Sequence, residues 1–251
     1  MPIKRIERKT VMDLGIFLNP ILLESGSINI IWLVLFALVS LALGYFLGGV
    51  NCAIVVSRLL YHDDIRKYGS KNAGMTNILR TYGKGAAALT LAGDILKTVI
   101  AVLVSRVIFG EPGAYIAGLG SVIGHIYPCY FGFKGGKGVA AVAATILCTN
   151  PLCFLILFAV FAVIVIGYKY VSLGSVMCMM LYPVLINRLG GGKVDIITTT
   201  CTFLIAALVI FKHKDNIKRL LKGNENKISL SGKKDKKKSY DSPEEKEDGN
   251  K

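Results

Sequence analysis

The sequence is poor in the groups from which proteins build metal centres and redox sites. It holds three histidines and 16 acidic residues in 251, and its six cysteines form no C-x-x-C pair. No cluster of His, Cys and carboxylate residues has the spacing of metal ligands. Because nearly all the cysteines lie in apolar stretches, we interpret them as small buried residues. We therefore expect no bound metal and no other cofactor.

Acidic residues are also few beside the 30 basic ones, and the formal net charge is +14. The basic residues lie between apolar runs and in the C-terminal tail. This distribution favours anionic lipid headgroups and anionic substrates as partners, and we expect no nucleic acid.

Long apolar runs dominate what remains, since 53% of the residues are hydrophobic. About 20 apolar residues cross a bilayer as a helix. The predicted fold class is an all-α integral membrane protein with about seven transmembrane helices. The expected spans are 30–50, 85–109, 114–131, 139–148, 152–167, 176–189 and 194–211.

The two ends of the chain differ from this core. Residues 1–27 carry the basic cluster Lys4 to Lys9 without the apolar core and cleavage site of a signal peptide, so we expect an N-terminal interfacial extension. Residues 28–223 are expected to form the polytopic domain. Residues 224–251 are rich in Lys, Glu, Asp, Ser and Asn, which predicts a disordered charged tail.

The most informative string runs from Gly124 to Gly138 and reads GHIYPCYFGFKGGKG. Glycine lets backbone N–H groups approach a ligand, consecutive N–H groups can form an anion nest, and lysine adds a mobile charge. The string predicts a phosphate site at a bilayer surface. It is not a Walker loop, because Gly138 follows Lys137 where that motif needs Ser or Thr. Taken alone, it is equally typical of a flexible basic connector.

A second polar string, Gly69 to Lys84, reads GSKNAGMTNILRTYGK. Its hydroxyl, amide and guanidinium groups are those that bind phosphate and glycerol oxygens. A polar turn with a helix cap is the alternative. Asp94 and Lys97 lie three residues apart within an apolar span, which favours an intramembrane ion pair. His125 is expected to be a packed, hydrogen-bonded histidine rather than a base.

Topology brings these strings together. With seven spans, the loops after the first, third and fifth spans share one side with the tail, and they carry most of the basic residues. The positive-inside rule places that side in the cytoplasm. The Lys4 to Lys9 cluster argues for the opposite orientation, but the larger set carries more weight. We therefore expect the polar site loops on the cytoplasmic face.

Six strings occur in this order: GYFLGGVN at 44–51, GSKNAGMTNILR at 69–80, Asp94-x-x-Lys97, 124–138, VSLGS at 171–175 and His213-x-x-Asn216. Together they resemble the bacterial acyl-phosphate-dependent glycerol-3-phosphate acyltransferases, the PlsY family. The resemblance covers roughly residues 44–227, and Gly49 and Met75 are small departures from the family pattern.

The resemblance implies acyl transfer from acyl phosphate to the 1-hydroxyl of glycerol 3-phosphate, giving lysophosphatidate and phosphate. It also implies a multi-pass protein of the bacterial plasma membrane, in contact with membrane lipid. No H-x-x-x-x-D string occurs, which argues against the other large class of glycerolipid acyltransferases.

The same resemblance assigns site residues. It implies catalytic roles for Lys137, Arg80 and His213, with His213 orienting or deprotonating the attacking hydroxyl; the substrate's own phosphate is the other candidate to take that proton. The implied substrate-binding residues are Ser70, Asn72, Thr76, Asn77, Gly135, Gly136, Ser172 and Asn216. A transporter or channel for a phosphorylated solute remains the alternative function, although no inverted repeat is visible.

Overall fold

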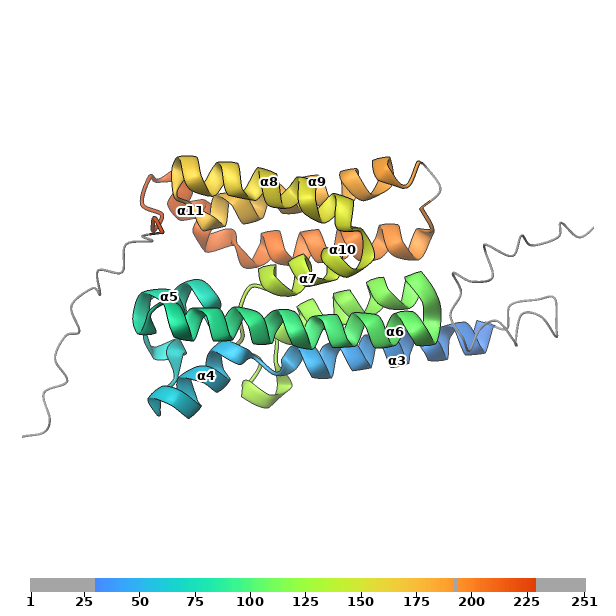
Figure 1. The fold of residues 1–251 in the computed structure, drawn as a ribbon, viewed down its shortest axis with the longest axis horizontal. Coiled ribbons are helices and arrows are strands. Elements are labelled where there is room, and N and C mark those ends of the chain that lie inside the picture. The colour runs from blue at the N-terminus through green and yellow to red at the C-terminus, as the bar shows by residue number, and fades with distance from the viewer. Residues whose placement is uncertain (1–29, 192–193, 229–251) are drawn as a thin grey trace, which may run out of the picture.

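The computed structural model describes residues 30–191 and 194–228, and every regular element in these ranges is a helix (Figure 1). The predicted all-α class is therefore confirmed for the described residues. The helices are α3 (Ile30–Gly49), α4 (Cys52–Tyr61), α5 (Met75–Tyr82), α6 (Lys84–Ile126), α7 (Val139–Thr149), α8 (Pro151–Tyr168), α9 (Val171–Leu189), α10 (Ile196–Lys212) and α11 (Lys214–Leu221), with short 3₁₀ turns η1 (Ile65–Lys67) and η2 (Cys129–Phe131).

Helix α6 is a hairpin rather than one straight rod. Gly110 has φ 69°, outside the helical range, and the ribbon reverses direction there (Figure 1). Asp94 and His125 lie 3.5 Å apart, oxygen to nitrogen, across this hairpin. A straight helix would separate them by about 46 Å at 1.5 Å per residue. The break between the expected spans 85–109 and 114–131 thus lies at Gly110, and Pro112 falls in the first turn of the second segment, where proline is tolerated.

Helix α3 packs against the second segment of α6 through glycines on both partners. A Cβ atom at Gly44 would lie 2.1 Å from the Ala117 carbonyl oxygen, and one at Gly124 would lie 2.1 Å from that of Tyr45. Such contacts let two backbones approach closely, which is how helices associate in lipid. The glycines therefore fix the distance between α3 and the hairpin.

Asn51 stands at the break between α3 and α4. Its side-chain oxygen accepts a hydrogen bond from the Ile54 N–H (3.1 Å), and its amide nitrogen donates to the Ala73 carbonyl (3.2 Å). One buried residue thus caps α4 and ties it to the second polar string.

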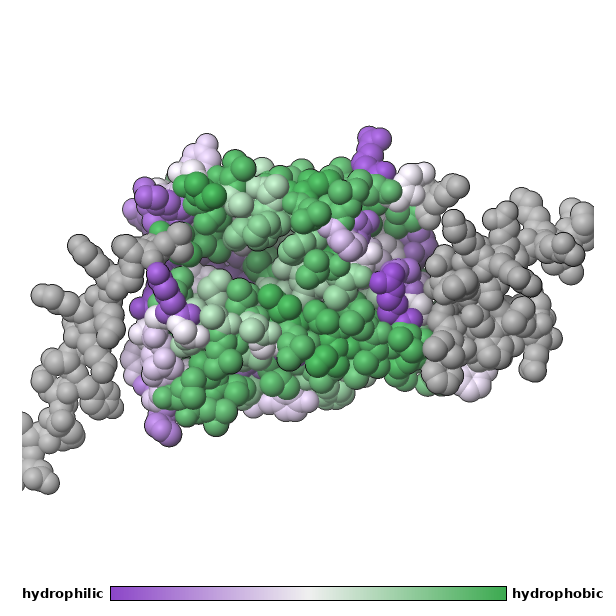
Figure 2. Space-filling model, viewed as in Figure 1, coloured by the Kyte–Doolittle hydropathy of each residue, from purple (hydrophilic) through white to green (hydrophobic). Residues whose placement is uncertain are grey.

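The surface fits a chain that lies within a bilayer. Apolar side chains cover the middle of the visible face and polar ones gather towards both ends (Figure 2). Among the described residues, four helices are long and apolar enough to cross a membrane, or five if the bent pair of α10 and α11 is one span. Helix α7 has only 11 residues. The count of seven crossings and the position of the polar loops on the cytoplasmic face remain predictions.

The ends of the chain are only partly described. The expected N-terminal extension, 1–27, lies outside the described residues, as do residues 229–251 of the expected tail. Residues 224–228, which we assigned to that tail, have a defined place: the Ile228 N–H donates to the Lys169 carbonyl (2.8 Å), and only 5% of the Glu225 side chain is exposed. The expectation of disorder was wrong for this short stretch, here called the C-terminal strap (224–228), because hydrogen bonds to the helix ends hold it.

Candidate active site

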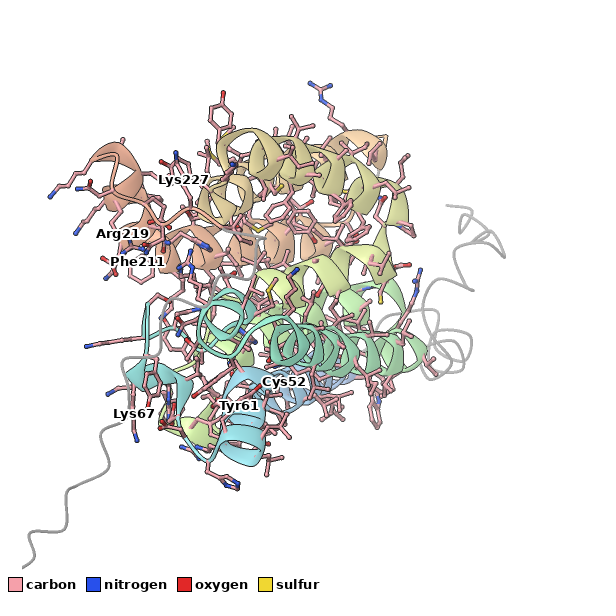
Figure 3. The ribbon with its side chains drawn as sticks, turned by 60° about the vertical axis from the view of Figure 1, so that its left-hand side comes forward. Cys52, Tyr61, Lys67, Phe211, Arg219 and Lys227 are labelled. Carbon is pink, nitrogen blue, oxygen red and sulfur yellow. The ribbon has the colours of Figure 1, made fainter. Side chains whose placement is uncertain are left out.

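The polar strings meet at one end of the bundle, where α4, α5 and α11 lie (Figure 1). Arg66 of the α4–α5 connection hydrogen-bonds to the Lys134 carbonyl, and Lys137 hydrogen-bonds to Asn216 of α11. Figure 3 shows Arg219 and Lys227 at the same end as Lys67. Segments as far apart in the sequence as Lys67 and Lys227 therefore lie at one end of the bundle, as the topology argument predicts.

A hydrogen-bonded cluster occupies the centre of this end. The Asn216 side-chain oxygen accepts from the Lys137 ammonium, while its amide nitrogen donates to Glu225 Oε1 (2.7 Å). Ser172 Oγ donates to the same oxygen (3.0 Å), and Arg219 Nε donates to Glu225 Oε2 (2.8 Å). Of the predicted site residues, Lys137, Ser172 and Asn216 are thus brought together from a loop and two helices.

Lys137 and Glu225 have opposite charges in this cluster. Burial lowers the pKa of Lys137 to about 8, although the negative charge of Glu225 partly offsets that shift. Burial alone raises the pKa of Glu225, but the hydrogen bonds from Asn216, Arg219 and Ser172 outweigh it and the pKa is lowered overall. Glu225 therefore stays ionised near neutral pH, and it organises the donors around it.

His213 follows the last residue of α10, where the chain bends by 57° into α11. Its Nδ1 lies 2.7 Å from the Val209 carbonyl oxygen, which can only accept, so Nδ1 carries the proton and Nε2 keeps a lone pair. Burial, and then the nearby charge of Lys137, lower the pKa of His213 to about 4. The imidazole is accordingly neutral and is able to accept a proton at Nε2.

The second polar string contributes Arg80 and surrounds Asn77. Arg80 lies in the last turn of α5 and donates to the Asn226 carbonyl of the C-terminal strap (3.3 Å). The Asn77 side chain is buried, accepts from the Ser70 N–H (3.1 Å) and donates to carbonyls at 65, 68 and 72. Asn77 therefore shapes the turn that carries Ser70, and Ser70 itself is exposed.

Asn72 and Thr76 lie beside that turn, at the start of α5, and both are half-buried. The backbone carbonyl of Asn72 accepts a hydrogen bond from the Asn77 side chain. The Asn72 side chain takes no part in that hydrogen bond.

Gly135 and Gly136 are packed tightly against the end of α6. A Cβ atom at Gly135 would lie 2.0 Å from the His125 carbonyl oxygen, and one at Gly136 would lie 2.2 Å from His125 Nε2. Their N–H groups donate to the carbonyls of Ile126 (3.1 Å) and His125 (3.0 Å). The expected anion nest is therefore wrong at these two residues, because their amides face α6. The glycines instead bring Lys137 close to the helix end.

A buried ionic network lies beneath this loop. Lys97 Nζ is 2.8 Å from Asp94 Oδ1, and it donates to the carbonyls of Gly48 (2.8 Å) and Val50 (2.7 Å) at the end of α3. His125 Nδ1 lies 3.3 Å from the same ammonium. The predicted Asp94–Lys97 pair is confirmed, as is the packed, hydrogen-bonded His125.

Comparison with known proteins shows the family of the chain. Residues 38–223 match the family model described as glycerol-3-phosphate acyltransferase. The chain is 40% identical over 194 residues to the glycerol-3-phosphate acyltransferase of Thermoanaerobacter sp. (strain X514), covering 77% of this chain and 96% of the relative. It is 39% identical over 202 residues to that of Neisseria meningitidis serogroup B, covering 78% and 100%.

The chain belongs to the glycerol-3-phosphate acyltransferase family. The resemblance predicted from the sequence strings is thereby confirmed. The fold is also similar to crystal structures of PlsY, an integral membrane glycerol 3-phosphate acyltransferase. Its glycerol 3-phosphate form gives a TM-score of 0.71 at 35% identity, and the comparison covers 77% of this chain and 96% of that one. Its lysophosphatidic acid form gives 0.69 at 34%, covering 77% and 95%.

Glu225 and Arg219 belong to the hydrogen-bonded cluster, and the sequence argument did not select them. Glu225 lies one residue inside the expected tail, so the composition of 224–251 as a whole concealed it. One signal was present: a single acidic residue stands between Lys222 and Lys227. An isolated carboxylate in a basic segment is a natural partner for the lysine and arginine side chains around it.

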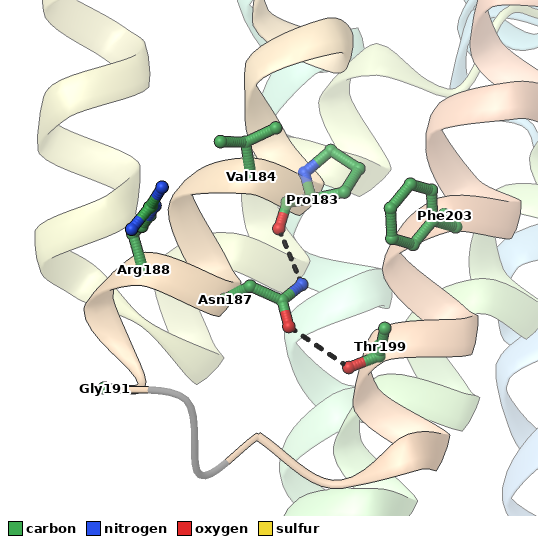
Figure 4. Close-up of a pocket in the computed structure, with 7 residues that line it drawn as sticks. All are labelled: Pro183, Val184, Asn187, Arg188, Gly191, Thr199 and Phe203. Carbon is green, nitrogen blue, oxygen red and sulfur yellow. Dashed lines mark hydrogen bonds between the residues drawn. The ribbon is translucent and has the colours of Figure 1, made fainter.

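A pocket of about 560 Å³ opens at the other end of the acyltransferase fold, between the end of α9 and the start of α10 (Figure 4). Asn187 there donates to the Pro183 carbonyl (2.9 Å) and lies 3.5 Å from the Thr199 hydroxyl. Arg188 is the one ionisable residue in its lining. The pocket is remote from Lys137. Ser172, which belongs to the same cluster as Lys137, lies at the start of α9, whereas the pocket lies at the opposite end of that helix.

Proposed function

We propose that this protein transfers an acyl group from acyl phosphate to the 1-hydroxyl of glycerol 3-phosphate, releasing lysophosphatidate and inorganic phosphate. One observation carries the proposal. Asn216, Ser172 and Arg219 donate to one carboxylate at the end of the bundle, and the Lys137 ammonium donates to Asn216 beside them. This concentration of donors and positive charge supports a site that binds an anion. The crystal structures that resemble this chain are named for glycerol 3-phosphate and lysophosphatidic acid, the substrate and product proposed here.

Charge and hydrogen-bonding capacity suggest how the substrates are held. Both carry phosphate, and Lys137, Arg80 and Asn216 offer an ammonium, a guanidinium fork and an amide to its oxygens. Ser70, Asn72 and Thr76 lie on the same string as Arg80 and are assigned to the glycerol and acyl-phosphate oxygens. Asn77, Gly135 and Gly136 act by shaping the two loops, and Ser172 acts through Glu225.

The proposed reaction needs orientation and charge stabilisation rather than a covalent nucleophile. The 1-hydroxyl oxygen attacks the acyl carbonyl carbon, and the bond from that carbon to the phosphate oxygen breaks. The bonding electrons leave with the phosphate, where Lys137 stabilises the developing charge. The hydroxyl proton passes to His213 Nε2 or to a phosphate oxygen of the substrate. No metal takes part in this scheme.

We place this site on the cytoplasmic face of a bacterial plasma membrane, with seven helices crossing the bilayer. The excess of basic residues at the site end supports that orientation through the positive-inside rule. The apolar belt supports a position in which an acyl chain stays in lipid while its phosphate reaches Lys137 (Figure 2).

The test is an assay of the purified full-length protein in lipid vesicles, with long-chain acyl phosphate and labelled glycerol 3-phosphate. We expect lysophosphatidate and phosphate in equal amounts, undiminished by EDTA and much slower with acyl-CoA or acylated carrier protein as donor. Equal rates with a thioester donor would overturn the acyl-phosphate assignment. Uptake of labelled solute without turnover would support the transporter instead.

A further inference from the structure

Arg66 joins the two polar strings through a single guanidinium group. It lies in η1 and its side chain is 22% exposed. Nε and Nη2 donate to the two carboxylate oxygens of Asp64, at 2.9 and 2.7 Å. This bidentate pair fixes the plane of the guanidinium, and it leaves Nη1 directed away from Asp64.

Nη1 donates to two carbonyls of the glycine loop, those of Phe131 (2.7 Å) and Lys134 (3.1 Å). These carbonyls flank the only two consecutive left-handed residues in the described part of the chain, Gly132 (φ 67°) and Phe133 (φ 58°). A side chain such as that of Phe133 rarely adopts this conformation. The residues of this turn do not favour its backbone conformation, and the hydrogen bonds from Arg66 stabilise it.

The turn determines where Lys137 lies. Beyond Lys134, the next two amides are already bonded to the end of α6 through the His125 and Ile126 carbonyls. Lys137 follows directly, so the turn that Arg66 holds and the amides bound to α6 together fix the chain that leads into it. Arg66 is fixed in turn, because Asn77 binds the carbonyls of Ile65 and Tyr68 on both sides of it.

We propose that Arg66 is a positioning residue, which sets the place of the Lys137 ammonium relative to the Ser70–Arg80 string. It contacts no substrate in this account, and the proposal rests on the acyltransferase function proposed above. The geometry requires a guanidinium, because a lysine ammonium is a single point that cannot pair with a carboxylate in a bidentate manner and reach two carbonyls.

Arg58 provides a matched control. Its Nη2 donates to Asp64 Oδ2 (3.1 Å), and it stacks over the Phe131 ring at 5.5 Å, but its side chain is 51% exposed. Arg58→Ala therefore removes a neighbouring arginine from the same carboxylate without removing the two bonds to the loop carbonyls.

The experiment compares steady-state kinetics of Arg66→Ala, Arg66→Lys and Arg58→Ala in vesicles, with thermal unfolding in detergent to verify the fold. We expect Arg66→Ala to lower kcat by roughly 10- to 100-fold, as a misplacement of about 1 Å does. Arg66→Lys should lose nearly as much, and Arg58→Ala should stay within about twofold of wild type, as an exposed pair does. Full activity in Arg66→Lys, or an equal loss in Arg58→Ala, would overturn the proposal.

A double-mutant cycle separates positioning from general destabilisation. If Arg66 acts through Lys137, Arg66→Ala should cost less than about threefold in a Lys137→Ala background, because coupled residues are not additive. Fully additive losses would contradict the inference. The activity of the wild type separates failure of the proposed function from failure of this inference. An inactive wild type refutes both. An active wild type with unchanged kcat in Arg66→Ala refutes the positioning role of Arg66 alone.

Discussion

The ammonium of Lys137 donates a hydrogen bond to the side-chain oxygen of Asn216, which is 79 residues away in the sequence. This contact joins the glycine loop to α11. The Asn216 amide then extends it to Glu225, so a loop, a helix and the C-terminal strap share one network. A substrate phosphate that enters the cluster is expected to compete with Asn216 for the ammonium.

The shifted pKa of Lys137 predicts a basic limit to activity. Burial disfavours the charged form and lowers the pKa to about 8, so the ammonium is present below pH 8 and is lost as the pH rises through it. The plot of kcat/KM against pH, which reports the free enzyme, should fall above about pH 8. Lys137→Arg keeps its charge and should remove that limb. A limb that persists unchanged in Lys137→Arg would assign it to another group.

Arg80 and a lysine at the same position should not be equivalent. The guanidinium offers a rigid fork for phosphate oxygens, whereas lysine offers one point charge. Arg80→Lys is therefore expected to lose most of the kcat/KM that Arg80→Ala loses. The measurement is steady-state kinetics with glycerol 3-phosphate varied at saturating acyl phosphate. Near wild-type rates in Arg80→Lys would show that only the charge matters.

Two truncations should separate the part of the C-terminal segment that activity requires from the part that it does not. A chain ending after Ile228 keeps the strap and should retain turnover, whereas one ending after Gly223 loses Glu225 and should be much less active. Glu225→Ala leaves Asn216, Ser172 and Arg219 without their shared acceptor and should lower stability by about 1–3 kcal/mol, as unpaired buried groups do. Thermal unfolding in detergent measures this, with Glu225→Gln as the isosteric control. Equal stability of Glu225→Ala and wild type would remove Glu225 from the network.

Close helix contact predicts a large effect from one methyl group. In Gly124→Ala the added Cβ would meet the Tyr45 carbonyl oxygen at 2.1 Å, so α3 must move away, at a cost of roughly 1–3 kcal/mol in unfolding free energy. Gly85→Ala, with nothing within 4 Å, is the control. It should be neutral or slightly stabilising. If both variants unfold at the same temperature, the packing of α3 on α6 is looser than described.

The sequence predicted the features that depend on local composition. Each expected span coincides with a helical segment, because apolar runs and the turn near Gly110 are local signals. It also predicted that Lys137, Ser172 and Asn216 belong to one site. It did not reveal which way the amides of Gly135 and Gly136 face, since glycine permits either direction. Arg66 escaped notice because the loop carbonyls that it binds lie 65 and 68 residues away in the sequence. Glu225 escaped notice because it falls within the charged composition of the expected tail.

The most direct test of the account is the steady-state kinetics of Lys137→Ala beside Lys134→Ala. The two lysines share one loop, but the Lys134 side chain is exposed. If Lys137 stabilises charge on the departing phosphate, Lys137→Ala should lower kcat and kcat/KM together by about 100- to 1000-fold, the value of roughly 3–4 kcal/mol at a developing anion. Lys134→Ala should remain close to wild type. A Lys137→Ala enzyme with unchanged kcat and only a raised KM would show that the loop binds substrate without taking part in catalysis.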